Sequence, residues 1–321
     1  MDLGETVSLL MQERKGILLE GEATDVENER LAAFGAGNED ARRAYRELLL
    51  TTPGIETHLS GVILSPESVH ESSVDGVTFP ALLASKNIST GVLLDTSASA
   101  QEKFSQTLRE YKTHGMTFGA MFVTTSVSDE VISDELQKNI HALAAAAKLC
   151  HAEGIVPVLA IDVSASGVHG AAHAEDVILE TLSLLSDALK AEEIDVQNIV
   201  IGVSMAVSGS DHSARADAAE VAERTVRAAT TALPEKTGGV VFLSDAQDAE
   251  EATANLNALA RLEPLPWPIA FCFARALQEP VLAEWKGNEE NRATAQAIFE
   301  GRLALLSRAD AAGYASTLEE R

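Results

Sequence analysis

Short apolar runs rich in β-branched residues alternate with longer amphipathic segments along most of the chain. Several of these runs are apolar almost throughout, which is typical of strands buried on both faces. The pattern predicts eight strands: Gly16–Gly21, His58–Leu64, Thr90–Asp95, Met116–Thr124, Ile155–Asp162, Ile199–Met205, Gly239–Ser244 and Ile269–Ala274.

Helical periodicity fills the segments between these runs, for example Asp134–His151, Ala174–Leu189, Ala214–Leu233 and Ala249–Leu262. Strands that alternate with helices in this way predict an α/β fold, a closed (β/α)8 TIM barrel. An open doubly wound sheet is the alternative, but no GxGxxG follows the first strand. Without a linker or charge block, residues 1–321 are predicted to form a single domain, with one extra C-terminal helix over Asn288–Leu306.

The charge and composition of the chain limit the classes of molecule that it is expected to bind. The 49 acids against 24 bases give a formal net charge of −25, which repels nucleic acid and acidic membranes. The plainer interpretation is that the acids keep an alanine-rich protein in solution. No apolar run reaches the roughly 18 residues of a membrane helix, and no signal peptide begins the chain. We therefore expect a soluble cytoplasmic protein that contacts neither nucleic acid nor the membrane interior.

Seven segments, in order and at similar spacing from about Lys15 to Tyr314, resemble class I fructose-bisphosphate aldolase. They are RRAYRELLLT (Arg42–Thr51), GVILSPES (Gly61–Ser68), DGVTFPALLASK (Asp75–Lys86), GIVPVLAID (Gly154–Asp162), FLSDAQDAEEATANLNAL (Phe242–Leu259), FCFARALQ (Phe271–Gln278) and WKGNEENRATAQ (Trp285–Gln296). The resemblance implies the same barrel, and a reaction in which a strand lysine forms an imine with a ketose phosphate before C–C cleavage.

At the positions that the resemblance assigns to that chemistry, the residue types differ. Glycine stands where the family has its imine-forming lysine, and small or apolar residues stand at the other acids and bases. These positions are Gly202 for the lysine, Gly21 for the catalytic aspartate, Leu93, Ala120 and Phe122 for basic residues, and Ala160 for the glutamate.

A second observation does not depend on that register. None of the nine lysines falls within a predicted strand. Imine formation requires a primary amine, so the sequence predicts a protein that is not an enzyme, a pseudoenzyme on an aldolase scaffold.

Part of a phosphate site is retained. Ser244, Arg275 and Arg30 match the family, but Asp245 and Ala274 replace neighbouring glycines. A carboxylate close to a phosphate dianion repels it, so we expect this site to be vestigial. Local ion pairing is an equally simple role for Arg275.

The resulting hypothesis is a structural or protein-interaction role without a cofactor or bound metal. Because the family associates with cytoskeletal filaments, the resemblance implies a protein partner in a cytoskeletal or flagellar (axonemal) assembly.

Two alternatives stay open. A sugar-phosphate sensor would use Arg275 and Arg30. An enzyme of another class would hold a metal through Asp95, Asp162, Glu20 or Glu22.

Two histidine-containing motifs are interpreted as structural. His169 and His173 have a metal-like spacing but lack a third ligand, and their segment is predicted to open a helix. The stretch Ser208–His212 is predicted to be a helix N-cap.

Overall fold

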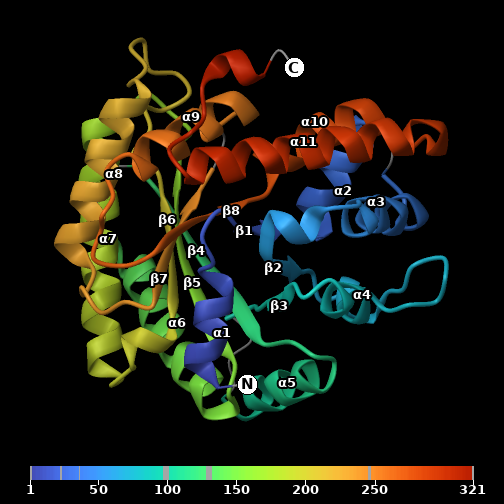
Figure 1. Ribbon diagram of the computed structural model, residues 1–321. Helices are drawn as coiled ribbons and strands as arrows, with labels where there is room; N and C mark the ends of the chain where they lie inside the picture. Colours follow the sequence, from blue (N-terminus) through green and yellow to red (C-terminus); the bar gives the residue numbers. More distant parts are fainter. Residues whose placement is uncertain are drawn as a thin grey trace.

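The computed structural model describes residues 2–21, 24–35, 37–96, 101–127, 132–244 and 247–319. Eight parallel strands form a closed barrel in chain order, and the last strand pairs with the first (Figure 1). The predicted (β/α)8 barrel is therefore confirmed. The strands are β1 (Gly16–Leu19), β2 (Leu59–Leu64), β3 (Ser89–Leu93), β4 (Phe118–Ser126), β5 (Val156–Ser164), β6 (Val200–Ser204), β7 (Gly239–Leu243) and β8 (Ile269–Phe273).

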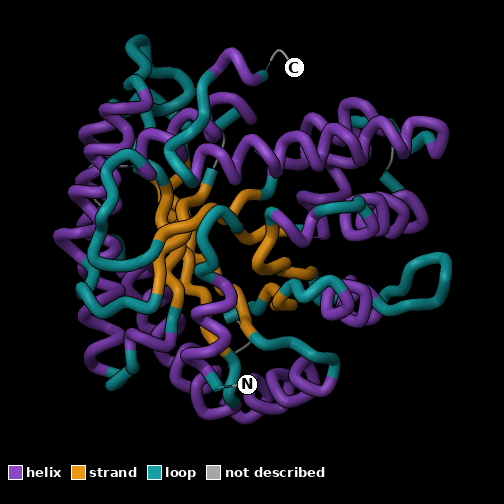
Figure 2. The backbone as a smooth tube through the Cα atoms, in the orientation of Figure 1, coloured by secondary structure: helices purple, strands orange, loops and turns teal. Residues whose placement is uncertain are grey.

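Most of the helices surround this barrel as an outer layer (Figure 2). They are α1 (Leu3–Leu10), α2 (Thr24–Ala33), α3 (Glu39–Thr51), α4 (Phe79–Ser85), α5 (Gln101–Thr113), α6 (Asp134–Glu153), α7 (Ala171–Ala191), α8 (Ala218–Ala232), α9 (Ala249–Ala260), α10 (Arg275–Trp285) and α11 (Arg292–Asp310). The extra C-terminal helix corresponds to α11, which packs against α10, α9 and α3. It begins later than predicted because Asn288 opens a short 3-10 turn and its side chain accepts the Glu290 N–H.

Helix α1 was not predicted, because eight residues carry little periodic signal. A capping box between Asp2 and Glu5 fixes its start. Val7, Leu10 and Met11 pack into the cluster of apolar side chains inside the barrel. The hydroxyl of Ser60 in β2 also donates to the Leu10 carbonyl at 2.7 Å. Helix α1 therefore closes the end of the barrel where the strands begin.

The loop Ser208–His212 is not the helix N-cap that the sequence predicted. Helix α8 is capped by Asp217, whose side chain accepts the Glu220 N–H. The Ser208 hydroxyl instead accepts the Ala216 N–H at 3.1 Å, within the loop that precedes the helix. The hydroxyl of Ser208 thus stabilises a longer β6–α8 connection than the sequence suggested.

Inside the barrel, glycines make room for one large ring. Phe118 of β4 is fully buried, and a Cβ built on Gly91 of β3 would lie 2.3–2.5 Å from three atoms of its ring. Real side chains do not approach this closely, so the glycine and the phenylalanine are packed as a pair. The interior of the barrel is consequently filled with side chains.

We expect the Gly91→Ala substitution to lower the free energy of unfolding by about 1–3 kcal/mol, because the added methyl group overpacks the interior. Urea denaturation would measure the loss. Gly301→Ala is the matched control, since nothing lies within 4 Å of its Cβ position in α11, and there alanine is expected to be neutral or stabilising. Equal stability changes in the two variants would contradict the proposed pairing of Gly91 with Phe118.

Candidate functional site at the carboxyl-terminal mouth

Five of the six positions that the sequence assigned to lost catalytic groups lie on four neighbouring strands, β3 to β6. Phe122, Ala160 and Gly202 are direct register partners across β4, β5 and β6. Leu93 and Ala120 are partners across β3 and β4. Leu93, Ala120, Phe122 and Ala160 all belong to the apolar cluster inside the barrel. The structure therefore brings these positions together, although their assignment to particular catalytic groups stays a prediction.

A side chain at position 202 would point into the barrel interior. A Cβ at Gly202 would lie 2.8 Å from the Cβ of Ala160 and 3.5 Å from Leu243 Cδ2. A longer side chain at this position would project among apolar neighbours and would require Ala160 to shift. Small residues on β5 and β6 are thus packed against each other.

The sixth position, Gly21, follows β1 and is restricted by its neighbour on the adjacent strand. A Cβ there would lie 2.4 Å from Ser65 Cβ and 2.9 Å from the Ser65 backbone nitrogen. Close approach of two backbones requires glycine. The local packing at the ends of β1 and β2 therefore excludes an aspartate at this position.

All nine lysines lie in described segments, and none lies in a strand. Three of them donate to backbone carbonyl oxygens and so support the scaffold: Lys15 Nζ to Glu56 O at 2.7 Å, Lys86 Nζ to Thr52 O at 3.2 Å, and Lys112 Nζ to Glu153 O at 2.6 Å. Lys103 and Lys138 lie early in α5 and α6, the helices that follow β3 and β4, and both are exposed. Because these helices begin where the strands end, these two lysines lie on the mouth side of the barrel.

The mouth also holds a buried charged network that the sequence did not predict as a unit. Arg46 of α3 is 1% exposed, and its Nε lies 3.2 Å from Oε1 of the buried Glu20. Its two terminal nitrogens contact Glu67 at 3.2 Å and Glu71 at 3.0 Å. Glu20 also accepts the Ser65 N–H at 3.2 Å.

Arg46 comes from the segment Arg42–Thr51, and Ser65 and Glu67 come from Gly61–Ser68, two segments that carried the family resemblance. The motifs of both segments were therefore visible in the sequence, but hydrophobic periodicity does not show that the two segments contact each other in the fold. Because its carboxylate is occupied by Arg46 and the β2–α4 loop, Glu20 joins α3 to the barrel and is poorly placed to bind a metal.

Two of the three predicted phosphate-binding residues, Arg30 and Arg275, are connected through helix α10. Arg30 of α2 donates from Nη2 to Gln278 Oε1 at 2.9 Å, and Gln278 Nε2 donates to the Leu19 carbonyl at 2.7 Å. Gln278 lies one turn after the exposed Arg275 in α10. Gln278 thus ties α2, α10 and the end of β1 together. Ser244, directly after β7, is buried.

The acids considered for a metal site do not converge. Asp95 is exposed after β3, Asp162 accepts from the Thr124 hydroxyl at 3.3 Å, and Glu22 lies outside the described residues. Within the segments that the structure describes, no group of three or more Asp, Glu, His or Cys side chains could hold a metal ion.

His169 directly precedes Gly170, the N-cap of α7, and His173 lies in the first turn of that helix, so the segment opens a helix as predicted. His169 lies close to both His173 and His212. Burial lowers the pKa of His169, and the two neighbouring histidines lower it further. A lowered pKa keeps the ring neutral at physiological pH.

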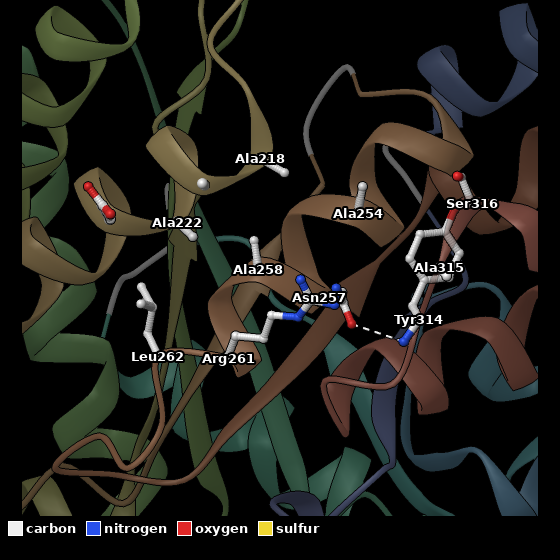
Figure 3. A pocket seen from close by; sticks show the side chains of 12 residues that line it. Ala218, Ala222, Ala254, Asn257, Ala258, Arg261, Leu262, Tyr314, Ala315 and Ser316 are labelled. Carbon is white, nitrogen blue, oxygen red and sulfur yellow. Dashed lines mark hydrogen bonds between the residues drawn. The ribbon is translucent and has the colours of Figure 1, made fainter.

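A groove of about 500 Å³ lies on the outer helices (Figure 3). Alanines of α8 and α9 form part of its wall, and Tyr314 closes one side, where its backbone N–H donates to Asn257 Oδ1 at 2.9 Å. No strand residue lines this groove, so it is separate from the mouth of the barrel.

The family follows from a match along the whole chain. A family model described as class-I fructose-bisphosphate aldolase matches residues 2–321. The chain belongs to this aldolase family. Among its relatives is a protein of Xylella fastidiosa named "Probable fructose-bisphosphate aldolase class 1", 34% identical over 89% of this chain and 91% of its own length. "Fructose-bisphosphate aldolase 2" of Caenorhabditis elegans is 31% identical over 98% of this chain and 88% of its own length.

The three-dimensional fold agrees. A solved structure of fructose-bisphosphate aldolase from Plasmodium falciparum, in complex with TRAP and a small-molecule inhibitor, superposes with a TM-score of 0.92. It shares 28% sequence identity and covers 98% of this chain and 95% of its own. The family predicted from the seven segments is therefore confirmed.

The comparisons contradict the functional prediction that the sequence motivated. The relatives are named as fructose-bisphosphate aldolases, so the hypothesis of a non-catalytic pseudoenzyme with a structural role is wrong. Six substituted positions and strands without lysine do not by themselves establish loss of function. The cytoskeletal and flagellar assignment has no support in these names either.

Protein partners and the absence of a cofactor stay predictions. Among the described residues, no helix is both long and apolar enough to cross a bilayer.

Proposed function

We propose that this aldolase-family chain acts as a fructose-bisphosphate aldolase of glycolysis, with a phosphorylated ketose bound at the carboxyl-terminal mouth. The observation that carries the proposal is the match of almost the whole chain to proteins named for that reaction. One such relative, from Arabidopsis thaliana, is named "Fructose-bisphosphate aldolase 5, cytosolic" and is 33% identical over 93% of this chain. We therefore also propose a cytosolic location.

Phosphate binding is assigned to the side of the mouth formed by β7, β8 and α2. Arg275 opens α10, where backbone N–H groups and the helix dipole favour an anion. Arg30 is held beside α10 by Gln278, and Ser244 directly follows β7. Guanidinium groups bind phosphate through charge-assisted hydrogen bonds.

The geometry also restricts the mechanism. Imine formation needs a primary amine, and no strand supplies one. In this proposal the amine comes from Lys103 or Lys138, the two lysines on the mouth side. Only an uncharged amine attacks a carbonyl, so the rate of cleavage is expected to rise with pH.

A coupled assay of fructose 1,6-bisphosphate cleavage tests the activity. We expect measurable turnover, and an increase in KM of about tenfold or more for Arg275→Ala, because a charge-assisted hydrogen bond to phosphate contributes about 1.5–3 kcal/mol. Arg261→Ala, in the outer groove, is the matched control and is expected to leave KM unchanged. Absence of cleavage at millimolar substrate, with correctly folded protein, would overturn the proposal.

Borohydride reduction in the presence of substrate tests the amine separately. A stable adduct located by mass spectrometry at Lys103 or Lys138 supports the assignment. The Lys148→Met variant, which removes a lysine paired with Glu192 on the outer surface, should retain the adduct. Turnover without any adduct would refute the imine step while leaving the aldolase activity standing.

A further inference from the structure

A cavity of about 370 Å³ lies at the opposite end of the barrel, where β8 begins. Its wall combines apolar atoms of Met11, Pro268 and Ile269 with three carboxylates. Asp310, the last residue of α11, is 8% exposed, whereas Glu13 and Glu263 are exposed. One carboxylate is thus buried in the wall, and two stand nearer to solvent.

Asp310 has an incomplete set of hydrogen bonds. Its Oδ2 accepts the Arg14 backbone N–H at 2.8 Å. Its Oδ1 is buried and has no hydrogen-bond partner within the described part of the chain. A buried carboxylate oxygen in this state is costly, and a cationic donor is the group that would satisfy it best.

The charges around Asp310 favour a positive ligand. Burial is the main factor that raises its pKa, and the like charges of Glu263 and Glu13 raise it further, whereas the backbone hydrogen bond and the charge of Arg14 oppose them. Arg14 is exposed and is one of the residues that line the cavity, so one positively charged residue accompanies three negatively charged ones. The net charge of the residues that line the cavity is therefore negative.

The cavity is better suited to an organic cation than to a metal ion. Among the described residues, no three acidic, histidine or cysteine side chains are grouped closely enough to hold a metal. The apolar wall of Met11, Pro268 and Ile269 would contact an alkyl chain. We propose that this cavity binds a small aliphatic diamine, with one ammonium group on Asp310 and the other near Glu13 and Glu263.

Isothermal titration calorimetry of the full chain with 1,4-diaminobutane, at pH 8 and moderate salt, tests the proposal. We expect one site per chain and an affinity at least tenfold weaker in Asp310→Asn. Glu13→Gln combined with Glu263→Gln should weaken 1,4-diaminobutane more than 1-butylamine, which has a single ammonium group. Binding of the diamine should also weaken from pH 8 to pH 6, as Asp310 takes up a proton.

Asp187→Asn is the matched control, because Asp187 is exposed near the C-terminal end of α7 and its replacement changes the net charge equally. This control matters for a chain with a net charge of −25, which attracts cations over its whole surface. Identical titrations of the wild type, Asp310→Asn and Asp187→Asn would show that the diamine only screens the surface, and would overturn the proposal.

Discussion

Arg46→Met is expected to destabilise the fold by about 3–5 kcal/mol, the cost of breaking a buried ion pair from one side. The guanidinium is 1% exposed and contacts Glu20, Glu67 and Glu71. Methionine would leave the carboxylate of Glu20 buried in the protein without its cation. Urea denaturation followed by circular dichroism would measure the difference.

The double variant Arg46→Met with Glu20→Gln separates this cause from lost packing. Removing both charges should restore part of the stability, because the unpaired buried charge is gone. Lys148→Met breaks an exposed pair with Glu192 at 3.1 Å and should change stability by no more than about 0.5 kcal/mol. A loss below about 1 kcal/mol for Arg46→Met would contradict the importance of the network.

Asp310→Asn is expected to stabilise the protein at pH 8 by about 2–4 kcal/mol, an upper range set by the size of the pKa shift. Burial, then the charges of Glu263 and Glu13, raise the pKa of Asp310 from 3.8 to about 7, against the lowering effect of Arg14. The folded state therefore keeps the proton at pH values where the unfolded state has released it. The contribution of Asp310 to stability falls as pH rises from about 4 to about 7 and is constant above that.

Asparagine stays neutral and retains an oxygen that can accept the Arg14 N–H, so it avoids the cost of burying a charge. The unfolding free energies of the wild type and Asp310→Asn should therefore diverge between pH 4 and pH 7. Denaturation at four pH values across this window measures the divergence, with Asp187→Asn as the charge-matched control. Parallel pH profiles for the wild type and Asp310→Asn would contradict the raised pKa.

The functional prediction shows where sequence reasoning went too far. The family was correctly identified from segments such as Arg42–Thr51 and Phe271–Gln278. The absence of a lysine from every strand was also correct. The error was to infer a structural role from the substituted positions and the missing strand lysine. Substitutions at a few positions do not establish what the other residues of the mouth do. Lys103 and Lys138 were among the lysines considered, but only the order of strands and helices places them on the mouth side.

By itself, the sequence determined the eight strands, the major helices and the family, because these depend on local periodicity and on residue types at fixed spacing. The tertiary structure alone decided which distant side chains meet. Arg46 reaches Glu20, and Arg14 reaches Asp310 across 296 residues. The physical reason is that the free energy of a charge depends on its burial and on its neighbours in space, and the closing of the barrel sets both.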